Sequence, residues 1–269
     1  MLRKMSTAPG DATIMTGSRA HASPAAAVPP HPVMDGYYRD AAGKRPFLRD
    51  IFDATAGDYD KVERVLALGT GPWHRRRELR FAGLDHGMRV LDVAMGTGLV
   101  AREAASIVGD AALVLGVDPS IGMLGEARRS LGVAAVLGVG EALPVADAAF
   151  DFVSMGYALR HLPDLGAAFG EFARVLKPGG RVCVLEISRP RGAIGRAALS
   201  AYFRGVLPTL SRVIGTSAQT RELWRYYWQT IDACVEPEVV MTSLRRAGFS
   251  DVARRVQFGI FSTFTGTRG

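Results

Sequence analysis

Short apolar runs alternate with helix-like segments through the middle of this chain, and this alternation constrains the fold more than any other feature. The runs are four to seven residues long and end at turn residues; they are residues 89–94, 112–117, 134–137, 150–155 and 181–187. Segments with apolar residues at helical spacing lie between them, at residues 99–108, 123–131 and 164–176. Strands that alternate with helices form a parallel sheet covered by helices on both faces. We therefore predict an α/β protein with a doubly wound, mostly parallel sheet.

Changes in composition divide the rest of the chain. Residues 1–33 are rich in Ala, Pro, Ser and Thr without an apolar period, which predicts a disordered N-terminal extension. Residues 34–269 are predicted to form one domain with four parts, a helical cap, the alternating core, a second helical region and a closing helix with a strand pair; these span residues 34–87, 88–190, 191–235 and 236–269. The tight connection at Gly259 favours an antiparallel strand pair at the end of the sheet.

The charged residues and cysteines exclude several classes of protein. The 33 basic and 26 acidic residues give a net charge of +7, but the arginine clusters are short, lie in separate segments and have no interleaved aromatic residues. Nucleic acid is therefore not an expected partner. Cys183 and Cys234 are too few for a disulfide framework or a four-ligand zinc site, and we expect no metal. We predict a cytoplasmic protein; the basic, acid-poor stretch 1–33 is also typical of a mitochondrial transit peptide, which would place the protein in the matrix.

The end of the first apolar run has the features of a nucleotide site. The turn Met95–Gly98 follows the run, and Asp118 ends the next run about 20 residues later, where a carboxylate can accept both hydroxyl groups of a ribose. This turn formally fits the glycine pattern of turns that bind a dinucleotide. Asp92, however, would repel a pyrophosphate, whereas it could reach the ammonium of a methionine group directly or through water. This carboxylate favours S-adenosylmethionine over a dinucleotide.

A series of motifs resembles the class I S-adenosylmethionine methyltransferases. They occur in the family's order and spacing and comprise residues 92–98, 118–120, 140–144, 150–151 and 174–180. Residues 174–188 resemble the signature of the ubiquinone/menaquinone C-methyltransferases (UbiE/MenG type), as do residues 52–56, the pair Tyr59-Asp60 and residues 158–160. The resemblance extends from about residue 45 to the end of the chain. It implies a Rossmann-like fold, an enzyme, a cofactor-binding core at 88–190 and an acceptor-side lid at 191–235.

The resemblance also implies which residues bind the cofactor S-adenosyl-L-methionine. The expected binding residues come from the four loops at the ends of the runs; they are Asp92, Ala94, Gly96, Thr97, Gly98, Asp118, Pro119, Gly140, Glu141 and Tyr157. Gly96 and Gly98 would line the methionine end, and Asp118 would bind the ribose. Gly140 and Glu141 would frame the adenine, chiefly through backbone groups. Val139 departs from the family, because this position usually carries an acidic residue or Asn that holds the adenine amino group.

The resemblance implies a catalytic role for Arg160, whose counterpart acts on a hydroquinone hydroxyl group. His161 replaces the usual Asn and fits two roles, a base for that hydroxyl or a loop histidine bonded to the backbone. Arg160 is alternatively a surface residue at a helix entry. Tyr59 would reach into the acceptor pocket or pack in the core. For Asp164 we predict the N-cap of the following helix rather than a catalytic base.

Two functions fit these residues. The first is C-methylation of a prenylated hydroquinone, of demethylmenaquinol or demethoxyubiquinol type, in ubiquinone or menaquinone biosynthesis. The second is O-, N- or C-methylation of a small aromatic acceptor in a soluble secondary-metabolite pathway, which Glu63, Ala67, Val139 and His161 favour. Residues 199–214 would form a lid over an apolar tail, touch a membrane or simply pack in the core. The sequence thus allows peripheral membrane contact, and it allows a homodimer.

Overall fold

The structure is a computed structural model that describes residues 27–66, 69–213 and 215–269. The predicted extension 1–33 lies mostly outside these residues. Its last part differs from the prediction, because residues 28–31 pack on the domain. The Val28 amide donates to Asp164 Oδ1 at 3.0 Å, and the Val235 amide donates to the Pro30 carbonyl at 2.8 Å. The ordered domain therefore begins before residue 34.

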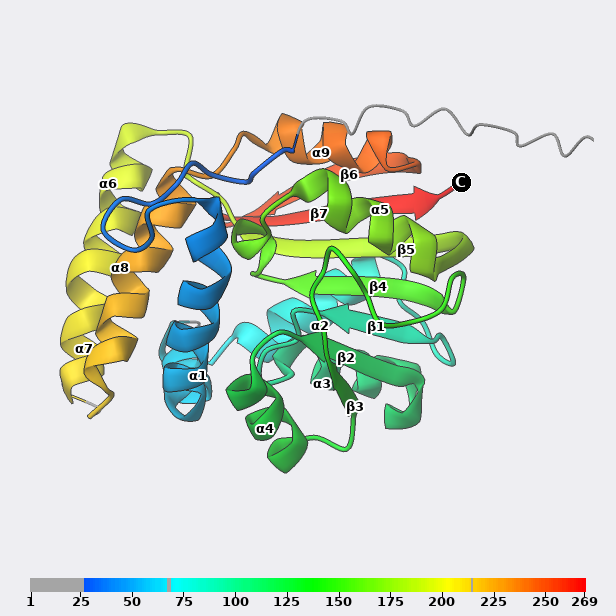
Figure 1. Cartoon of the computed structure of the whole chain (residues 1–269), viewed down its shortest axis with the longest axis horizontal. Coiled ribbons are helices and arrows are strands. Elements are labelled where there is room, and N and C mark those ends of the chain that lie inside the picture. Colours follow the sequence, from blue (N-terminus) through cyan, green and yellow to red (C-terminus); the bar gives the residue numbers. More distant parts are fainter. Residues whose placement is uncertain (1–26, 67–68, 214) are drawn as a thin grey trace, which may run out of the picture.

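Seven strands form one sheet within the described residues (Figure 1). They are β1 (Val90–Val93), β2 (Val114–Asp118), β3 (Ala134–Leu137), β4 (Phe150–Gly156), β5 (Leu176–Ile187), β6 (Phe249–Gln257) and β7 (Phe261–Arg268). Their spatial order is β3-β2-β1-β4-β5-β7-β6. The first five pair in parallel, and β7 is antiparallel to both β5 and β6. The predicted fold class and the closing antiparallel pair are confirmed.

Helices cover both faces of the sheet and one end of it (Figure 1). They are α1 (Ala41–Leu66), α2 (Gly71–Phe81), α3 (Leu99–Val108), α4 (Ile121–Ser130), α5 (Leu165–Val175), α6 (Ala193–Ala201), α7 (Leu207–Val213), α8 (Ala218–Asp232) and α9 (Pro237–Arg246), with the short turns η1 (Ala111–Leu113), η2 (Leu159–His161) and the π-helical η3 (Tyr202–Val206). Helices α5 and α9 pack on one face, and α2, α3 and α4 pack on the other.

The packing of the helices follows their apolar stripes. Helix α5 buries Leu165, Ala168, Phe169 and Phe172, whose spacing places them on one side. Asp164 is its N-cap and accepts from the Gly166 amide at 2.9 Å, which confirms the predicted cap. This cap fixes where the chain leaves η2, the turn that borders the site described below.

The second helical region packs against α1 and against the end of β5 at Ile187. Leu199, Phe203 and Leu207 repeat every four residues and are buried against α8, which contributes Trp224 and Tyr226. These side chains form a third apolar core with the N-terminal part of α1. Of the roles considered for residues 199–214, core packing is the one that this buried stripe fills.

Candidate active site

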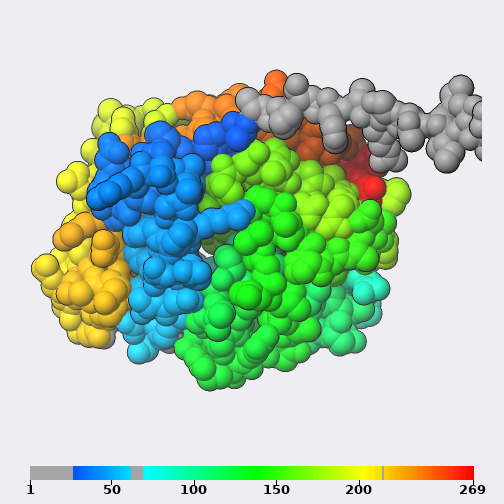
Figure 2. All heavy atoms as spheres, viewed as in Figure 1, coloured from blue at the N-terminus to red at the C-terminus, as the bar shows by residue number. Residues whose placement is uncertain are grey.

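A cavity of about 460 Å³ lies at the carboxyl ends of β1, β2 and β4, beneath α1. This is the edge at which open α/β sheets bind ligands, and the volume is that of a small-molecule site. Its mouth lies between the α1 segment and the loops that follow β2 and β3, where Figure 2 shows a hollow between blue and green spheres. Nine of the predicted site residues line it: Tyr59, Ala94, Gly96, Asp118, Pro119, Gly140, Glu141, Tyr157 and His161.

Asp118 organises the half of the cavity that is predicted to bind the cofactor. Its Oδ2 accepts from the Gly96 amide and its Oδ1 from the Ser120 amide, each at 2.8 Å. Burial raises the pKa of the Asp118 carboxyl to about 6, although these two N–H donors act in the opposite direction. Each carboxylate oxygen retains a second lone pair. Asp118 can therefore hold two loops together and still accept hydroxyl groups from a ligand.

The loop after β1 leaves room for a ligand close to the backbone. Gly96 has a φ of 57°, and a Cβ added to it would meet no atom within 4 Å. Ala94 and Tyr157 also line the cavity and have φ values of 54° and 60°, although neither is a glycine. Non-glycine residues at positive φ cost free energy and concentrate at functional sites. A cradle of this shape suits the methionine end of S-adenosylmethionine.

Three predicted cofactor residues lie under the loop rather than on the cavity wall. Asp92 is fully buried and accepts from Ser154 Oγ at 2.7 Å through Oδ1, whereas its Oδ2 has no hydrogen-bond partner among the described residues. Burial raises the pKa of Asp92 to about 7, against the effect of the Ser154 hydrogen bond. Thr97 Oγ1 donates to Asp60 Oδ1 at 2.6 Å, and Gly98 is the left-handed N-cap of α3.

The predicted adenine end of the cavity departs from the resembled family at the position that the sequence indicates. Val139 and Gly140 line the cavity, and valine has no side-chain atom that can accept a hydrogen bond. Glu141 lines the same end and forms an ion pair with Arg45 of α1, with a 3.0 Å distance from Oε2 to Nη2. The Arg45 side chain is 57% exposed. This ion pair therefore joins the cap to the core at the rim of the cavity.

His161 forms part of the opposite wall, where the acceptor is predicted to bind. Its ring packs edge-on against Phe52 at 5.2 Å and stacks on Tyr226 at 5.8 Å between centroids. Both ring nitrogens lack hydrogen-bond partners among the described residues. The alternative that His161 is a loop histidine bonded to the backbone is therefore wrong. Burial and then the charge of Arg160 hold the pKa of His161 well below its usual value. The imidazole is therefore neutral at pH 7, and one of its nitrogens can accept a hydrogen bond.

Tyr59 and Tyr227 complete this wall. The Tyr227 hydroxyl donates to Tyr59 Oη at 3.3 Å, and both side chains line the cavity. Burial raises the pKa of Tyr227 well above its usual value, so its hydroxyl stays protonated. The prediction that Tyr59 borders the pocket agrees with its place in the structure.

Arg160 lies behind the wall instead of on it. Its side chain is 1% exposed, pairs with Glu186 of β5, and donates from Nε to Thr230 Oγ1 at 3.3 Å. The guanidinium carbon lies 5.4 Å from the centre of the Tyr227 ring. The alternative of a surface residue at a helix entry is wrong. Arg160 does not line the cavity, so the structure does not place its guanidinium against an acceptor hydroxyl. The predicted direct action of Arg160 on that hydroxyl stays a prediction.

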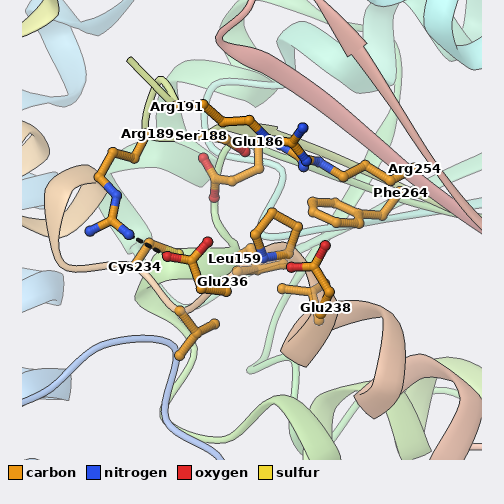
Figure 3. Close-up of a pocket in the computed structure, with 13 residues that line it drawn as sticks. Leu159, Glu186, Ser188, Arg189, Arg191, Cys234, Glu236, Glu238, Arg254 and Phe264 are labelled. Atoms are coloured by element: carbon orange, nitrogen blue, oxygen red, sulfur yellow. Dashed lines mark hydrogen bonds and ion pairs between the residues drawn. The ribbon is translucent and has the colours of Figure 1, made fainter. Parts of the chain in front are cut away.

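A second cavity of about 60 Å³ lies on the other side of Glu186 (Figure 3). Arg189, Arg254 and Glu236 converge on it, and Arg189 forms an ion pair with Glu236. Cys234 also lines it, and burial raises the pKa of its thiol to about 12, which agrees with a cysteine that takes no part in catalysis. Charged groups compensate one another in this cavity.

Comparison with known proteins identifies the family. Residues 40–268 match the family model described as the ubiE/COQ5 methyltransferase family. The chain belongs to this family. It is 34% identical over 230 residues to the ubiquinone/menaquinone biosynthesis C-methyltransferase UbiE of Geobacter sulfurreducens, which covers 82% of this chain and 88% of that protein. It is 29% identical over 220 residues to the demethylmenaquinone methyltransferase of Staphylococcus saprophyticus, with 80% and 93% covered. The predicted family is confirmed.

Solved structures share the fold at lower identity. A SAM-dependent methyltransferase of Thermotoga maritima has a TM-score of 0.59 at 21% identity, covering 82% of this chain and all of that one. The [4+2]-cyclase SpnF has a TM-score of 0.58 at 19% identity, with 82% and 94% covered. These likenesses concern the fold alone. Family membership makes this protein a methyltransferase with S-adenosylmethionine as its methyl donor, so the predicted enzyme class and cofactor are confirmed.

Several further residues of this ubiE/COQ5-family site are not among those predicted from the sequence to bind the cofactor or act in catalysis. Phe52, Ser120 and Tyr227 line the cavity, and Arg45 closes its rim. Phe52 lies within the motif at residues 52–56, and Ser120 follows Asp118 directly, so both lay beside recognised positions. Tyr227 is one of several aromatic residues in α8, and only packing distinguishes it from its neighbours.

Proposed function

We propose that this protein methylates a ring carbon of a prenylated hydroquinone in ubiquinone or menaquinone biosynthesis. Its family and the names of its relatives support the general reaction, S-adenosylmethionine-dependent C-methylation in quinone biosynthesis. The observation that carries the assignment to a quinol is the match of residues 40–268 to the ubiE/COQ5 methyltransferase family, and the predicted cofactor loops and acceptor wall line one cavity.

The cofactor half has the groups that S-adenosylmethionine needs. Asp118 would accept the ribose hydroxyls, Gly96 would allow the methionine group to approach the backbone, and Gly140 would present its backbone to the adenine. When bound, S-adenosylmethionine supplies an electrophilic methyl group on a sulfonium. The residues of this half position that group and take no part in proton transfer.

The acceptor half suits an aromatic ring that carries a hydroxyl group. Phe52, Met155 and Leu162 give it apolar contacts. Neutral His161 would accept a hydrogen bond from the hydroxyl group and take its proton as the ring carbon attacks, because the lowered pKa of His161 disfavours an imidazolium formed beforehand. The negative charge that develops on the hydroxyl oxygen makes the ring carbons nucleophilic. The ring carbon then takes the methyl group and loses its hydrogen as a proton, which restores the aromatic ring. Holding both partners in line supplies much of the rate.

A small soluble aromatic acceptor is the second candidate. Val139 and His161 favour it, because both line the cavity and both depart from the family. The two candidates differ in whether turnover requires a hydroquinone ring with a prenyl tail.

The test is turnover of the purified full-length protein with methyl-labelled S-adenosylmethionine. Reduced demethylmenaquinol and demethoxyubiquinol analogues with short tails would be compared with simple phenols and amines. A carbon-methylated hydroquinone supports the proposal. Methylation of phenols or amines without any quinol product would overturn it in favour of the second candidate.

We also propose peripheral contact with a membrane, because a prenylated acceptor is itself lipid-like. Ile194, Val206 and Val213 are exposed on the α6–α7 segment, beside the exposed Arg204 and Arg212. Such a surface suits an anionic bilayer. In the described part of the chain, no helix is both long and apolar enough to cross a membrane. Cosedimentation with anionic vesicles, compared with neutral ones, tests this contact. The cytoplasmic location and the homodimer stay predictions.

A further inference from the structure

Lys44 is a buried cation in the first turns of α1 that the proposed chemistry does not use. Its side chain is 5% exposed, and Nζ donates to the carbonyl oxygens of Arg160 at 3.1 Å and Leu162 at 2.8 Å. A buried ammonium is costly unless its donors are satisfied, so this placement requires a compensating role. The two carbonyls belong to the residues on either side of His161. Lys44 therefore holds the η2 turn on both sides of the imidazole.

The same helix also holds the cofactor loops. Asp53 Oδ1 accepts from Ser120 Oγ and from the Gly122 amide at 2.9 Å, and Asp60 accepts from Thr97. At 1.5 Å per residue, the distance along α1 from Lys44 to Asp60 is about 24 Å. One continuous helix thus sets the position of the acceptor wall relative to the cofactor loops.

The surroundings of Lys44 leave its charge largely uncompensated. The titratable and charged groups whose electric fields couple with it come from four parts of the chain; they are His31, Glu141, Arg160, His161 and Cys234. Glu186 pairs with Arg160, whereas no described carboxylate lies within ion-pair distance of Lys44. Burial lowers the pKa of Lys44 to about 8, and the charge of Glu141 opposes this shift. Below that pH, the ammonium donates charge-assisted hydrogen bonds to both carbonyl oxygens, and its charge is one of the causes that lower the pKa of His161.

We propose that Lys44 is the positioning residue of the acceptor site. Its two charge-assisted hydrogen bonds hold His161 at a fixed place relative to the cofactor loops. This inference rests on the proposed function, because it assumes an acceptor that ionises beside His161. Lys44 does not line the cavity, so it acts through η2 rather than by touching the substrate.

Loss of these hydrogen bonds should affect turnover much more than cofactor binding. In-line methyl transfer depends on alignment, and a displacement of about 1 Å can lower a rate by about 100-fold. We expect Lys44→Met to lower kcat by roughly this factor. The Kd for S-adenosylmethionine should stay within about twofold, because Asp53 and Asp60 hold the cofactor loops without Lys44.

The experiment compares the full-length wild type with Lys44→Met, Lys44→Arg and the control Lys61→Met. Lys61 lies on the same helix, and its exposed ammonium pairs with Asp58 at 3.7 Å. Melting temperature, Kd, kcat and KM would be measured for each protein, and kcat from pH 6.5 to 9.5. We expect the rate of the wild type to fall above about pH 8, as Lys44 loses its proton. Lys44→Arg should restore most of the rate and lack this decline, because its guanidinium stays charged.

The pH profile separates positioning from a purely structural role. Wild type and Lys44→Arg both carry a positive charge here below about pH 8, so ionisation of the acceptor affects these two proteins alike in that range. The difference between them at higher pH therefore reports on loss of the Lys44 proton. The inference would be overturned if Lys44→Met had the kcat of the wild type, or if Lys44→Arg showed the same decline in rate at alkaline pH. The measurement on Lys44→Arg tests the inference even if Lys44→Met does not fold. If the wild type methylates only non-quinone acceptors, the proposed function fails, while the ratio of variant to wild-type rates on that acceptor still tests Lys44.

Discussion

The carboxylate of Asp118 should make cofactor binding depend on pH in a way that the structure quantifies. Its two oxygens already accept from the Gly96 and Ser120 amides, so only the ionised form has lone pairs for both ribose hydroxyls. With a pKa of about 6, the group is mostly protonated at pH 5 and ionised at pH 7.5. A ligand that selects the ionised form then binds about tenfold more weakly at pH 5 than at pH 7.5.

Asp118→Asn removes both the charge and this pH dependence. Two charge-assisted hydrogen bonds contribute about 1.5 kcal/mol each, so the loss of about 3 kcal/mol should raise Kd by about 150-fold at pH 7.5. The variant should bind equally weakly at pH 5. Asp110→Asn is a matched control, because Asp110 caps η1 through the Ala112 amide and does not line the cavity.

Isothermal titration calorimetry with S-adenosylmethionine from pH 5 to 8 measures these effects. Titrations in two buffers of different ionisation enthalpy also count the protons released on binding. Asp92, with a pKa of about 7, can add a second slope above pH 6, and the variant Asp92→Asn separates it. A wild-type Kd that is constant over this range, or an Asp118→Asn Kd within threefold of wild type, would refute the reasoning.

Three further predictions concern the acceptor wall and the buried charges. His161→Ala should lower kcat by about 100-fold or more and leave the Kd for S-adenosylmethionine unchanged, as single-turnover rates and calorimetry would show. Arg160→Met should lower the free energy of unfolding by about 3 to 5 kcal/mol because it leaves Glu186 buried and unpaired, and Arg160→Met with Glu186→Gln should recover part of this in urea titrations. The pKa of Asp92 is raised on folding, so the stability that this carboxyl contributes is present below its unfolded pKa and is lost as the pH rises towards 7. Asp92→Asn should therefore be more stable than wild type at pH 8, by up to about 4 kcal/mol. Equal melting temperatures at pH 5 and pH 8 in both proteins would contradict this.

The sequence predicted best the elements whose periodicity is local. The helix expected at residues 99–108 and the strand at 134–137 have those bounds in the structure. Strand β5 begins earlier than expected, at Leu176, because the turn before residue 181 continues the pairing with β4 across a register shift. The π-helical η3 was also not predicted, since a π turn has no periodicity signal of its own.

The limits of sequence reasoning are clearest for the basic residues of the site. Arg160 follows a strand that ends at the site, and its type suits an exposed or ligand-binding position, yet the partner that buries it, Glu186, lies 26 residues later. Lys44 has no motif around it, and lysine is rarely buried. Both placements depend on contacts between distant segments, which only folding brings together.

The two outer strands of the sheet bear on how copies of this protein can associate. An exposed strand edge is a template for pairing with another sheet, and proteins block it with short strands, charges and bulges. Strand β3 has only four residues, and β6 carries Arg254 and Arg255 after a register shift between Ser250 and Ala253. Sheets of two molecules therefore have little edge to join. Any dimer of this protein should form through its helical surfaces, and β6 should stay accessible to solvent within it.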